Sequence, residues 1–496
     1  MPSSTHVRAK TIFLSLVVYA WFATCSALVG SGHRIVYPRL VESRSNDGRK
    51  VLKIQDDLVL NLEPSTVFSD VFMIQTFHNG KSHESYHDAE EFHKDLYQDP
   101  ERMASVIVTE GDDVKVEGVL GSRLRIRPAL EAERSLDGQT AHVVYEVQER
   151  MHSHHGDYAT MPLQSHFSPD HPQYDHMIAE RTDLQSKTVY PEVHIVVQYD
   201  HAKAFSFKNE AISRYFAVFM NVVNLRYASV SKPKVQIRIA GLTINKQMSD
   251  EPYVKRDHRY RILMKTGETM NAFMDHFRKK SFFTKVDIIF LVSRLDMVLG
   301  EGETMTIGVS GFSWCGGACT AFKFGQSEDM PLSYDGTHLF AHEVAHSLGC
   351  VHDEDPPDMW VGPHHPGATS CPWQDGYIMS YVLNDTNHWK FSSCCAAQMR
   401  YLFDLPTREC LREKNSNYAI QKTKMLPGIL VNSTLFCKYM HGWKYPKTYL
   451  DPDYDNSACK LQCIAPRPKR KLGDKIFTHY AIDGTRCRTA DPNYVS

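Results

Sequence analysis

The chain has 496 residues, of which 42% are hydrophobic and 23% are charged, a balance typical of globular proteins and a length with room for about three domains. Lys and Arg total 56 against 58 Asp and Glu. This near-neutral balance gives no reason to expect nucleic acid or a polyanionic membrane as the main partner.

The first 27 residues predict a secretory signal peptide. Arg8 and Lys10 precede the apolar stretch Thr11–Ala23, and Cys25-Ser26-Ala27 supplies small residues for cleavage after Ala27. A membrane anchor is the alternative, but the apolar stretch is short for a full span. No later run is long enough to cross a bilayer. We therefore expect a secreted, extracellular protein with no membrane anchor in its mature chain.

Strand and helix patterns alternate after residue 190. Strands are predicted at Val193–Tyr199, Lys234–Ile244 and Val286–Val292, and helices at Ala204–Tyr227 and Met264–Lys279. This order implies an α/β sandwich.

Cysteine is confined to the second half of the predicted mature chain. Apart from Cys25, all eleven cysteines lie between Cys315 and Cys487. In a secreted chain, close pairs such as Cys459 and Cys463 favour disulfides over metal binding. Because the number is odd, at least one thiol is expected to be free or paired between molecules.

Residues 342–353 carry the most specific pattern, His-Glu-Val-Ala-His-Ser-Leu-Gly-Cys-Val-His-Asp. On a helix, His342 and His346 stack one turn apart, so both imidazoles can reach a single zinc ion at about 2.0–2.1 Å. Gly349 lets the chain leave the helix with an unusual backbone angle, and His352 then becomes the third ligand.

Three protein ligands leave one coordination site open for water, whose pKa zinc lowers towards about 7. Glu343 follows His342 but is rotated off its face, and we assign it as the general base. A buried amphipathic helix is one alternative, although an apolar core gives no reason for Glu343 beside His342. The other is an inactive homologue that keeps its zinc.

A methionine downstream, together with residues 342–353, gives the chain a resemblance to a known family. Met379 in Tyr-Ile-Met-Ser-Tyr (377–381) lies where metzincins carry the Met-turn beneath the zinc, and residues 342–353 resemble their extended motif. Asp353 after His352 is carried by the reprolysin branch (adamalysins, ADAM and ADAMTS proteases), which the chain resembles over most of its length. Ala345 replaces the usual glycine, a helix-favouring change that removes no ligand.

The resemblance implies four segments and a metzincin fold, in which a twisted mixed sheet is combined with long helices and an active-site helix. The segments are a signal peptide (1–27), a β-rich prodomain (28–189), a zinc metalloprotease domain (190–413) and a small disulfide-rich, disintegrin-like module (414–496). The strand-like residues 114–128 and 142–147 match the prodomain. Maturation is expected between Arg181 and Tyr190, where Arg181 and Lys187 offer basic sites.

A prodomain implies a zymogen with the chain's own prodomain as inhibitor. In many relatives a prodomain cysteine thiolate fills the open zinc site, but residues 28–189 contain no cysteine. Our hypothesis is that a histidine-rich stretch contacts the zinc or blocks the cleft, and a solvated polar linker is the alternative. Its histidines are His152, His154, His155, His166 and His171.

Further details follow from the resemblance. Residues 304–314 resemble the edge strand that pairs with an extended substrate, an ordinary exposed strand being the alternative. The resemblance also implies disulfides Cys315–Cys410 and Cys371–Cys394. Carboxylates match structural calcium positions and suit that hard ion, although ordinary surface acids fit equally well. These carboxylates are Glu192, Asp287 and Glu413.

The C-terminal segment resembles the disintegrin-like module from Leu426 to Cys487 but carries fewer cysteines, so a small stapled cap on the catalytic domain is equally consistent. Asn384-Asp-Thr386 and Asn432-Ser-Thr434 are N-glycosylation acceptors, which implies that both loops face solvent.

We therefore predict a secreted zinc endopeptidase made as a zymogen. Its compact layout resembles reprolysins of tick saliva, which implies extracellular protein substrates such as fibrinogen, fibronectin or other matrix and clotting proteins. The competing interpretation is a proteolytically silent, zinc-containing binding protein that acts on integrins or host proteins through its C-terminal module.

Overall fold

The computed structural model divides the chain into two compact units, Met1–Ala419 and Ile420–Ser496. Several predicted features lie outside the described residues: the signal peptide, the five histidines of the predicted latency stretch, Arg181, Lys187 and Asn384. The described residues are 33–41, 48–78, 80–150, 156–160, 188–300, 305–383, 386–414, 428, 431–442, 444–467, 473–485 and 487.

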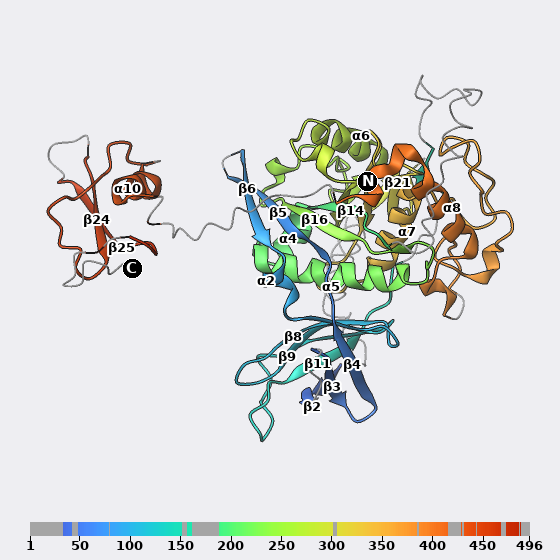
Figure 1. The fold of residues 1–496 in the computed structure, drawn as a ribbon, viewed down its shortest axis with the longest axis horizontal. Helices are drawn as coiled ribbons and strands as arrows, with labels where there is room; N and C mark the ends of the chain where they lie inside the picture. Colours follow the sequence, from blue (N-terminus) through green and yellow to red (C-terminus); the bar gives the residue numbers. More distant parts are fainter. Residues whose placement is uncertain are drawn as a thin grey trace, which may run out of the picture. The chain divides into compact units, whose positions relative to one another are not determined.

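A mixed sheet forms the centre of the first unit (Figure 1). β14 (Glu192–Val197) lies between β16 (Arg238–Ile244) and β18 (Ile288–Ser293), and β22 (Phe324–Glu328) follows β18. These four strands are parallel, and β21 (Gly311–Trp314) joins β22 in the antiparallel sense. The predicted α/β class is confirmed.

Helices cover both faces of this sheet, which explains why β18 is buried along its whole length. Ile288, Phe290 and Val292 belong to the core cluster that includes α5 (Asn209–Tyr227) and α7 (Thr337–Ser347). Ile289 and Leu291 belong to the cluster with α6 (Thr266–Phe277). Because alternate side chains of a strand point to opposite faces, the sheet lies between two helical layers.

The predicted helix Ala204–Tyr227 is wrong at its start. The chain forms α4 (Tyr199–Ala204) and then α5, and Ser206 and Phe207 between them have φ angles of 52° and 58°. Left-handed residues cannot continue a right-handed helix. Shorter elements complete the unit: α2 (Glu90–His93), β13 (Thr188–Val189), β15 (Lys234–Val235), β17 (Leu263–Lys265), β19 (Asp296–Leu299), β20 (Thr306–Ile307) and α8 (Ser393–Asp404).

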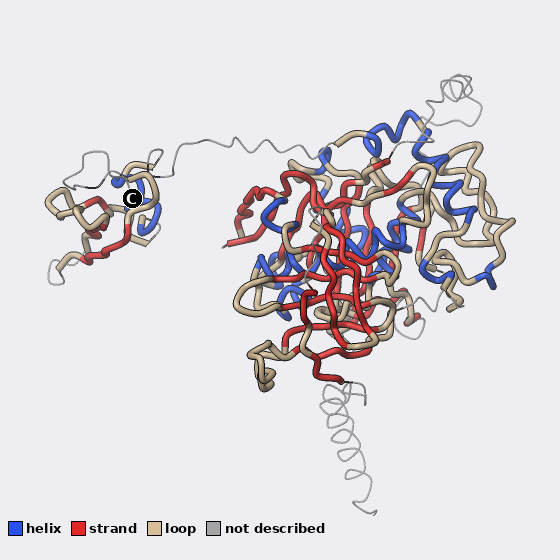
Figure 2. The backbone as a smooth tube through the Cα atoms, turned by 60° about the horizontal axis from the view of Figure 1, so that its bottom comes forward, coloured by secondary structure: helices blue, strands red, loops and turns tan. Residues whose placement is uncertain are grey.

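Nine strands between Arg34 and Glu146 form a second, antiparallel sheet (Figure 2), consistent with the β-rich pattern. It packs against α5, where Arg214 Nε lies 2.9 Å from Glu117 Oε1 and Asn221 Nδ2 donates to Ser105 Oγ. In spatial order its strands are β1 (Arg34–Val36), β11 (His142–Glu146), β10 (Leu124–Pro128), β9 (Lys115–Leu120), β8 (Ala104–Thr109), β7 (Leu96–Asp99), β4 (Leu58–Pro64), β3 (Lys50–Gln55) and β2 (Arg39–Val41).

The same N-terminal region also supplies both outer parts of the central sheet. β5 (Phe68–His78) pairs in parallel with β16, and β6 (Lys81–Asp88) pairs with β5. At the opposite edge, β12 (Tyr158–Ala159) pairs in parallel with β21. The predicted boundary at residue 189 therefore falls inside one compact unit in which a sheet is shared.

The second unit is small and held by disulfides. It contains α10 (Ser433–His441) and a sheet of β23 (Tyr449–Leu450), β24 (Lys460–Ala465) and β25 (Lys475–Tyr480). Disulfides Cys437–Cys463 and Cys459–Cys487 staple it. Asn432 is exposed, as the glycosylation motif predicts, and its side-chain oxygen accepts from the Leu435 amide to cap α10.

Three disulfides link the first unit: Cys319–Cys410, Cys350–Cys395 and Cys371–Cys394. The last confirms one predicted pair, whereas the predicted Cys315–Cys410 is wrong. Cys315 directly follows β21, and its side chain is fully buried, with Sγ 3.6 Å from the Cys350 carbonyl. Cys319 lies four residues on, with a φ of 65°, and reaches Cys410 instead.

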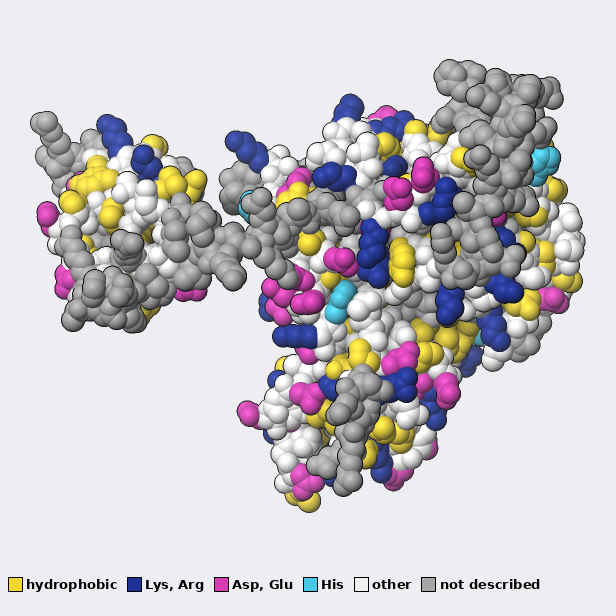
Figure 3. Space-filling view, viewed as in Figure 1, with side chains coloured by type: hydrophobic (Ala, Val, Ile, Leu, Met, Phe, Trp, Pro, Cys, Tyr) yellow, Lys and Arg dark blue, Asp and Glu magenta, His cyan; other side chains and the backbone are white. Residues whose placement is uncertain are grey.

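On the face shown in Figure 3, basic and acidic side chains are interspersed over the first unit. Among the described residues, no helix is long and apolar enough to cross a membrane.

We predict that Cys315 is the odd thiol and is inaccessible in the folded protein. After removal of the signal peptide, alkylation should label no cysteine in the native protein and one in denaturant, and mass spectrometry should place the label on Cys315. Cys315→Ala should abolish labelling. A label on Cys319 would show that the other pairing exists.

Candidate metal centre

Three imidazoles converge at the C-terminal half of α7. His342 and His346 lie on this helix, His352 follows it, and all three are buried. The Nε2 atom of His342 is 3.0 Å from that of His346 and 3.3 Å from that of His352. A tetrahedral zinc ion with bonds of about 2.0–2.1 Å needs ligand atoms about 3.3–3.4 Å apart. The spacing therefore fits one ion.

The turn after α7 brings His352 back to the helix. α7 ends at Ser347, and Gly349 has a φ of 96°, the left-handed conformation that the motif predicts. The Gly349 amide donates to the His346 carbonyl. Disulfide Cys350–Cys395 then fixes the turn to α8.

Backbone carbonyls orient two of the rings. His342 Nδ1 donates to the Ile378 carbonyl and His346 Nδ1 to the Cys350 carbonyl, each at 2.7 Å. With the proton on Nδ1, the Nε2 lone pair is free to bind a metal. Burial, followed by the neighbouring His342 and His352, lowers the pKa of His346 well below its ordinary value. The neutral form that metals require is therefore favoured.

Met379 and Asp353 fix the chain segment that follows the ligand His352. Met379 is fully buried, and its carbonyl accepts a 3.0 Å hydrogen bond from the Asp353 amide. Asp353 Oδ1 accepts from Ser392 Oγ at 2.6 Å, and Ser392 caps α8. Burial raises the pKa of Asp353 to about 6. These bonds tie the segment after His352 to the methionine turn.

Glu343 is fixed against the strand β21. Ser313 Oγ donates to Glu343 Oε2 at 2.7 Å and lies 2.8 Å from the Glu343 carbonyl. Gly311 allows this approach, since a Cβ there would lie 2.4 Å from Glu343 Oε1. Burial, and then the charge of Asp157, raise the pKa of Glu343 well above its ordinary value. Ser313 and Gly311 lie in the segment 304–314 that the sequence singled out, but their roles were not predicted.

Asp157 is the residue that the sequence analysis missed entirely. Its Oδ2 lies 3.2 Å from His342 Nε2, and its Oδ1 lies 3.1 Å from His352 Nε2. Tyr381 donates to Oδ2 at 2.6 Å. Ligand atoms of Asp157 and the three histidines all lie within 4.8 Å of one another. The only sequence signal was its position two residues after the first histidines of the predicted latency stretch.

The predicted calcium residues are not gathered in this way. Asp287 Oδ2 accepts from the Glu192 amide at 2.8 Å, and Glu192 Oε1 accepts from Ser69. Glu413 is exposed. Among the described residues, the compact groups of metal-type ligands include Asp287 with the disulfide Cys319–Cys410 but not the three carboxylates together. The calcium site stays a prediction.

Comparison with known families gives an independent result. The family model "Reprolysin_5: Metallo-peptidase family M12" matches residues 191–392. This range contains the three histidines, Glu343 and Met379.

Curated relatives cover most of the chain. An "A disintegrin and metalloproteinase with thrombospondin motifs like" protein of Bombyx mori is 28% identical over 82% of this chain and 66% of its own length. The venom metalloproteinase antarease TserMP_A of Tityus serrulatus is 25% identical over 80% of this chain and 97% of its own. The solved metalloproteinase-II of Bacteroides fragilis aligns at 10% identity over 79% of this chain and 95% of its own, with a TM-score of 0.34.

We predict that zinc binding depends on His352. His352→Ala removes one of three nitrogen donors, and zinc affinity should fall by more than the roughly 10–100-fold typical of outer-shell changes. Bound zinc can be measured by elemental analysis after dialysis. His258→Ala is the control, since the His258 side chain is 90% exposed. Full zinc occupancy in His352→Ala would refute the ligand assignment.

Proposed function

Because residues 191–392 form a reprolysin-type zinc metalloendopeptidase domain, we propose that this protein is a secreted zymogen that hydrolyses extracellular proteins with Glu343 as general base. The observation that carries the proposal is that the buried Nε2 atoms of His342, His346 and His352 converge on one point. Glu343 lies on the side of α7 that faces β21.

The donor set suits zinc. Three imidazoles are a common catalytic zinc set, and they leave a fourth position for water or substrate. Two of them, His342 and His346, are oriented by Nδ1 hydrogen bonds to backbone carbonyls. When bound, zinc supplies Lewis acidity that polarises a peptide carbonyl and makes water more acidic.

Glu343 handles the protons in this proposal. Ser313 Oγ holds Oε2, so the carboxylate keeps one orientation. Glu343 takes a proton from the attacking water and delivers it to the departing amine, so the bond between carbonyl carbon and nitrogen breaks without releasing an amide anion. An intact, positioned Glu343 argues against a proteolytically silent binding protein.

The edge of the central sheet supports an extended polypeptide as substrate. β21 is the outermost strand of residues 190–413, and its outer edge, which pairs with β12 in this structure, can pair with an added strand once β12 leaves. Secretion is supported by the five disulfides and by relatives named venom metalloproteinases. Matrix and clotting proteins such as fibronectin or fibrinogen are the substrate class we propose.

Three finer assignments belong to this proposal. Residues 28–189 act as the inhibitory prodomain, and residues 414–496 are a disintegrin-like module. Glu192, Asp287 and Glu413 are retained as a proposed calcium site, in which Asp287 lies against the Glu192 backbone.

Glu343→Gln should reduce kcat/KM of the processed protein on casein or gelatin by at least about 10²–10⁴-fold, because the base is lost while the shape is kept. Zinc content should not change. Glu268→Gln is the matched control, since Glu268 is half exposed on α6. Equal activity of Glu343→Gln and the control would refute the mechanism.

Gly311→Ala should also lower activity. The added methyl would lie 2.4 Å from Glu343 Oε1 and 2.7 Å from its Cγ, and displacing a catalytic group by about 1 Å costs about 10²-fold in rate. Gly267→Ala is the control because no atom lies within 4 Å of the added Cβ. Wild-type kcat in Gly311→Ala would show that the Glu343 position is not restricted by this strand.

A further inference from the structure

We propose that Asp157 is the fourth ligand of the metal in the uncleaved protein, and that residues 156–160, here called the plug, keep the enzyme latent. The inference rests on the proposed function and assigns the regulation of that site to residues of this chain.

The Asp157 carboxylate lies against the three histidine Nε2 atoms, where it could serve as a fourth ligand. One or other oxygen of Asp157 lies 3.2 Å from His342 Nε2, 3.1 Å from His352 Nε2 and 3.8 Å from His346 Nε2. These distances are close to the spacing of about 3.3–3.4 Å between ligands of a tetrahedral zinc ion, and carboxylate oxygen is a regular zinc ligand. No thiol is needed.

Burial of charge supports the same assignment. Asp157 and Glu343 are both fully buried, and their carboxylates lie close enough for the charge of Asp157 to act on Glu343. Two carboxylates out of water are costly unless positive charge compensates them. A divalent ion between the three Nε2 atoms and Asp157 provides that compensation.

The plug backbone occupies the edge of the central sheet. The Asp157 carbonyl accepts from the Ser313 amide at 3.1 Å, and the Ala159 carbonyl accepts from the Cys315 amide at 3.0 Å. These amides belong to the edge that we propose for substrate pairing. The plug therefore covers the substrate edge as well as the metal position.

Tyr158 closes the site between these two contacts. Its ring stacks on His346 with centroids 4.4 Å apart, and its hydroxyl donates to Asp355 Oδ2 at 2.9 Å. Three successive residues thus cover the metal position, a ligand ring and the substrate edge.

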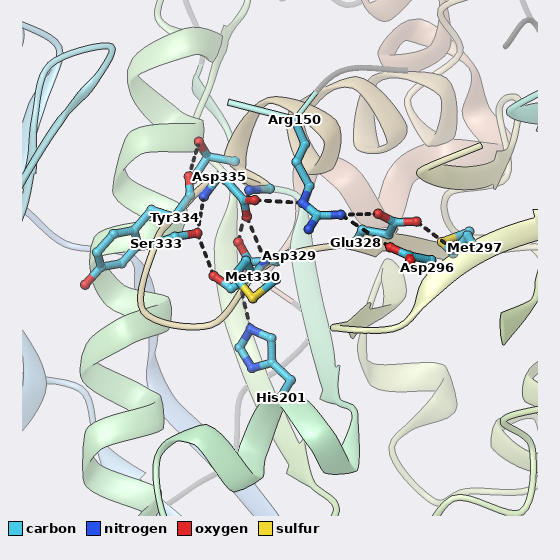
Figure 4. Close-up of polar contacts among 12 residues, drawn as sticks. Arg150, His201, Asp296, Met297, Glu328, Asp329, Met330, Ser333, Tyr334 and Asp335 are labelled. Carbon is cyan, nitrogen blue, oxygen red and sulfur yellow. Dashed lines mark hydrogen bonds and ion pairs between the residues drawn. The ribbon is translucent and has the colours of Figure 1, made fainter. Parts of the chain in front are cut away.

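An ionic anchor holds the chain just before the plug (Figure 4). Arg150 Nε lies 2.7 Å from Asp335 Oδ2, its second guanidinium nitrogen pairs with Glu328, and its amide donates to the Asp335 carbonyl. Glu328 ends β22, and Asp335 precedes α7. Because Arg150 is seven residues before Asp157, the anchor keeps the plug at high effective concentration near the metal.

The ligand assignment is tested without enzymatic activity. In a Glu343→Gln background, which prevents self-cleavage, the uncleaved secreted chain is loaded with cobalt(II) and its visible absorption is recorded. Asp157→Ala and the isosteric Asp157→Asn should change the spectrum, because a ligand is lost. In the zinc form, both should lose metal to a chelator at least about 10-fold faster. Asp137→Ala is the control, since that prodomain carboxylate is 67% exposed.

Circular dichroism shows whether each variant folds. Spectra and chelation rates of folded Asp157→Asn that match those of the Asp137→Ala control would overturn the ligand assignment.

Latency is tested in the chain with Glu343 intact. Uncleaved Asp157→Asn, verified by mass spectrometry, should hydrolyse a quenched fluorescent peptide at least about 10-fold faster than the uncleaved wild type. If the processed wild-type protein is active but uncleaved Asp157→Asn stays as silent as wild type, the plug proposal fails and the proposed function stands. If the processed wild-type protein is inactive, the proposed function fails, and the cobalt spectra still decide the role of Asp157.

Discussion

Three imidazoles, two carboxylates and a phenol meet at one buried point, and satisfying these groups away from water is the constraint on which the structure depends. Burying each polar group without a partner would cost about 2–7 kcal/mol, depending on the reference state. Every residue of α7 is buried, so the helix cannot relieve this cost by turning a histidine outwards. Its surroundings have to supply the partners instead.

Those partners come from elements far apart in the sequence. The turn around Met379 supplies a carbonyl to His342, and the turn pinned by Cys350–Cys395 supplies one to His346. β21 supplies Ser313 to Glu343. These groups hold the side chains on both sides of α7, and such preorganised contacts are how a catalytic site avoids reorganisation during the reaction.

Local rules made much of this predictable. The period of a helix places His342 beside His346, and a glycine at a left-handed position lets His352 return, so twelve consecutive residues encode three ligands and their turn. Strands buried on both faces, such as Val286–Val292, appear as continuous apolar runs. Features that depend on contacts between distant parts of the chain could not be predicted from such local patterns. Ser206 and Phe207 interrupt a helical pattern with no glycine or proline to mark the break. Whether Cys315 or Cys319 pairs with Cys410 depends on the direction in which the folded backbone points each side chain. Asp157 lies in a polar stretch, and nothing in the local sequence distinguishes it from other acidic residues.

The shared sheet bears on how the plug leaves the site. A single cut between Arg181 and Tyr190 frees the downstream end of the plug, but its upstream end stays attached to Arg150 and to the nine-stranded sheet. That region is held by the β5–β16 pairing and by side chains such as Phe68 and Ile107 in the core cluster of α5, whereas the described plug is only five residues long. Cleavage alone therefore leaves the plug at high local concentration. Full activation requires either that the larger contact dissociates or that a second cut falls between Arg150 and Asp157.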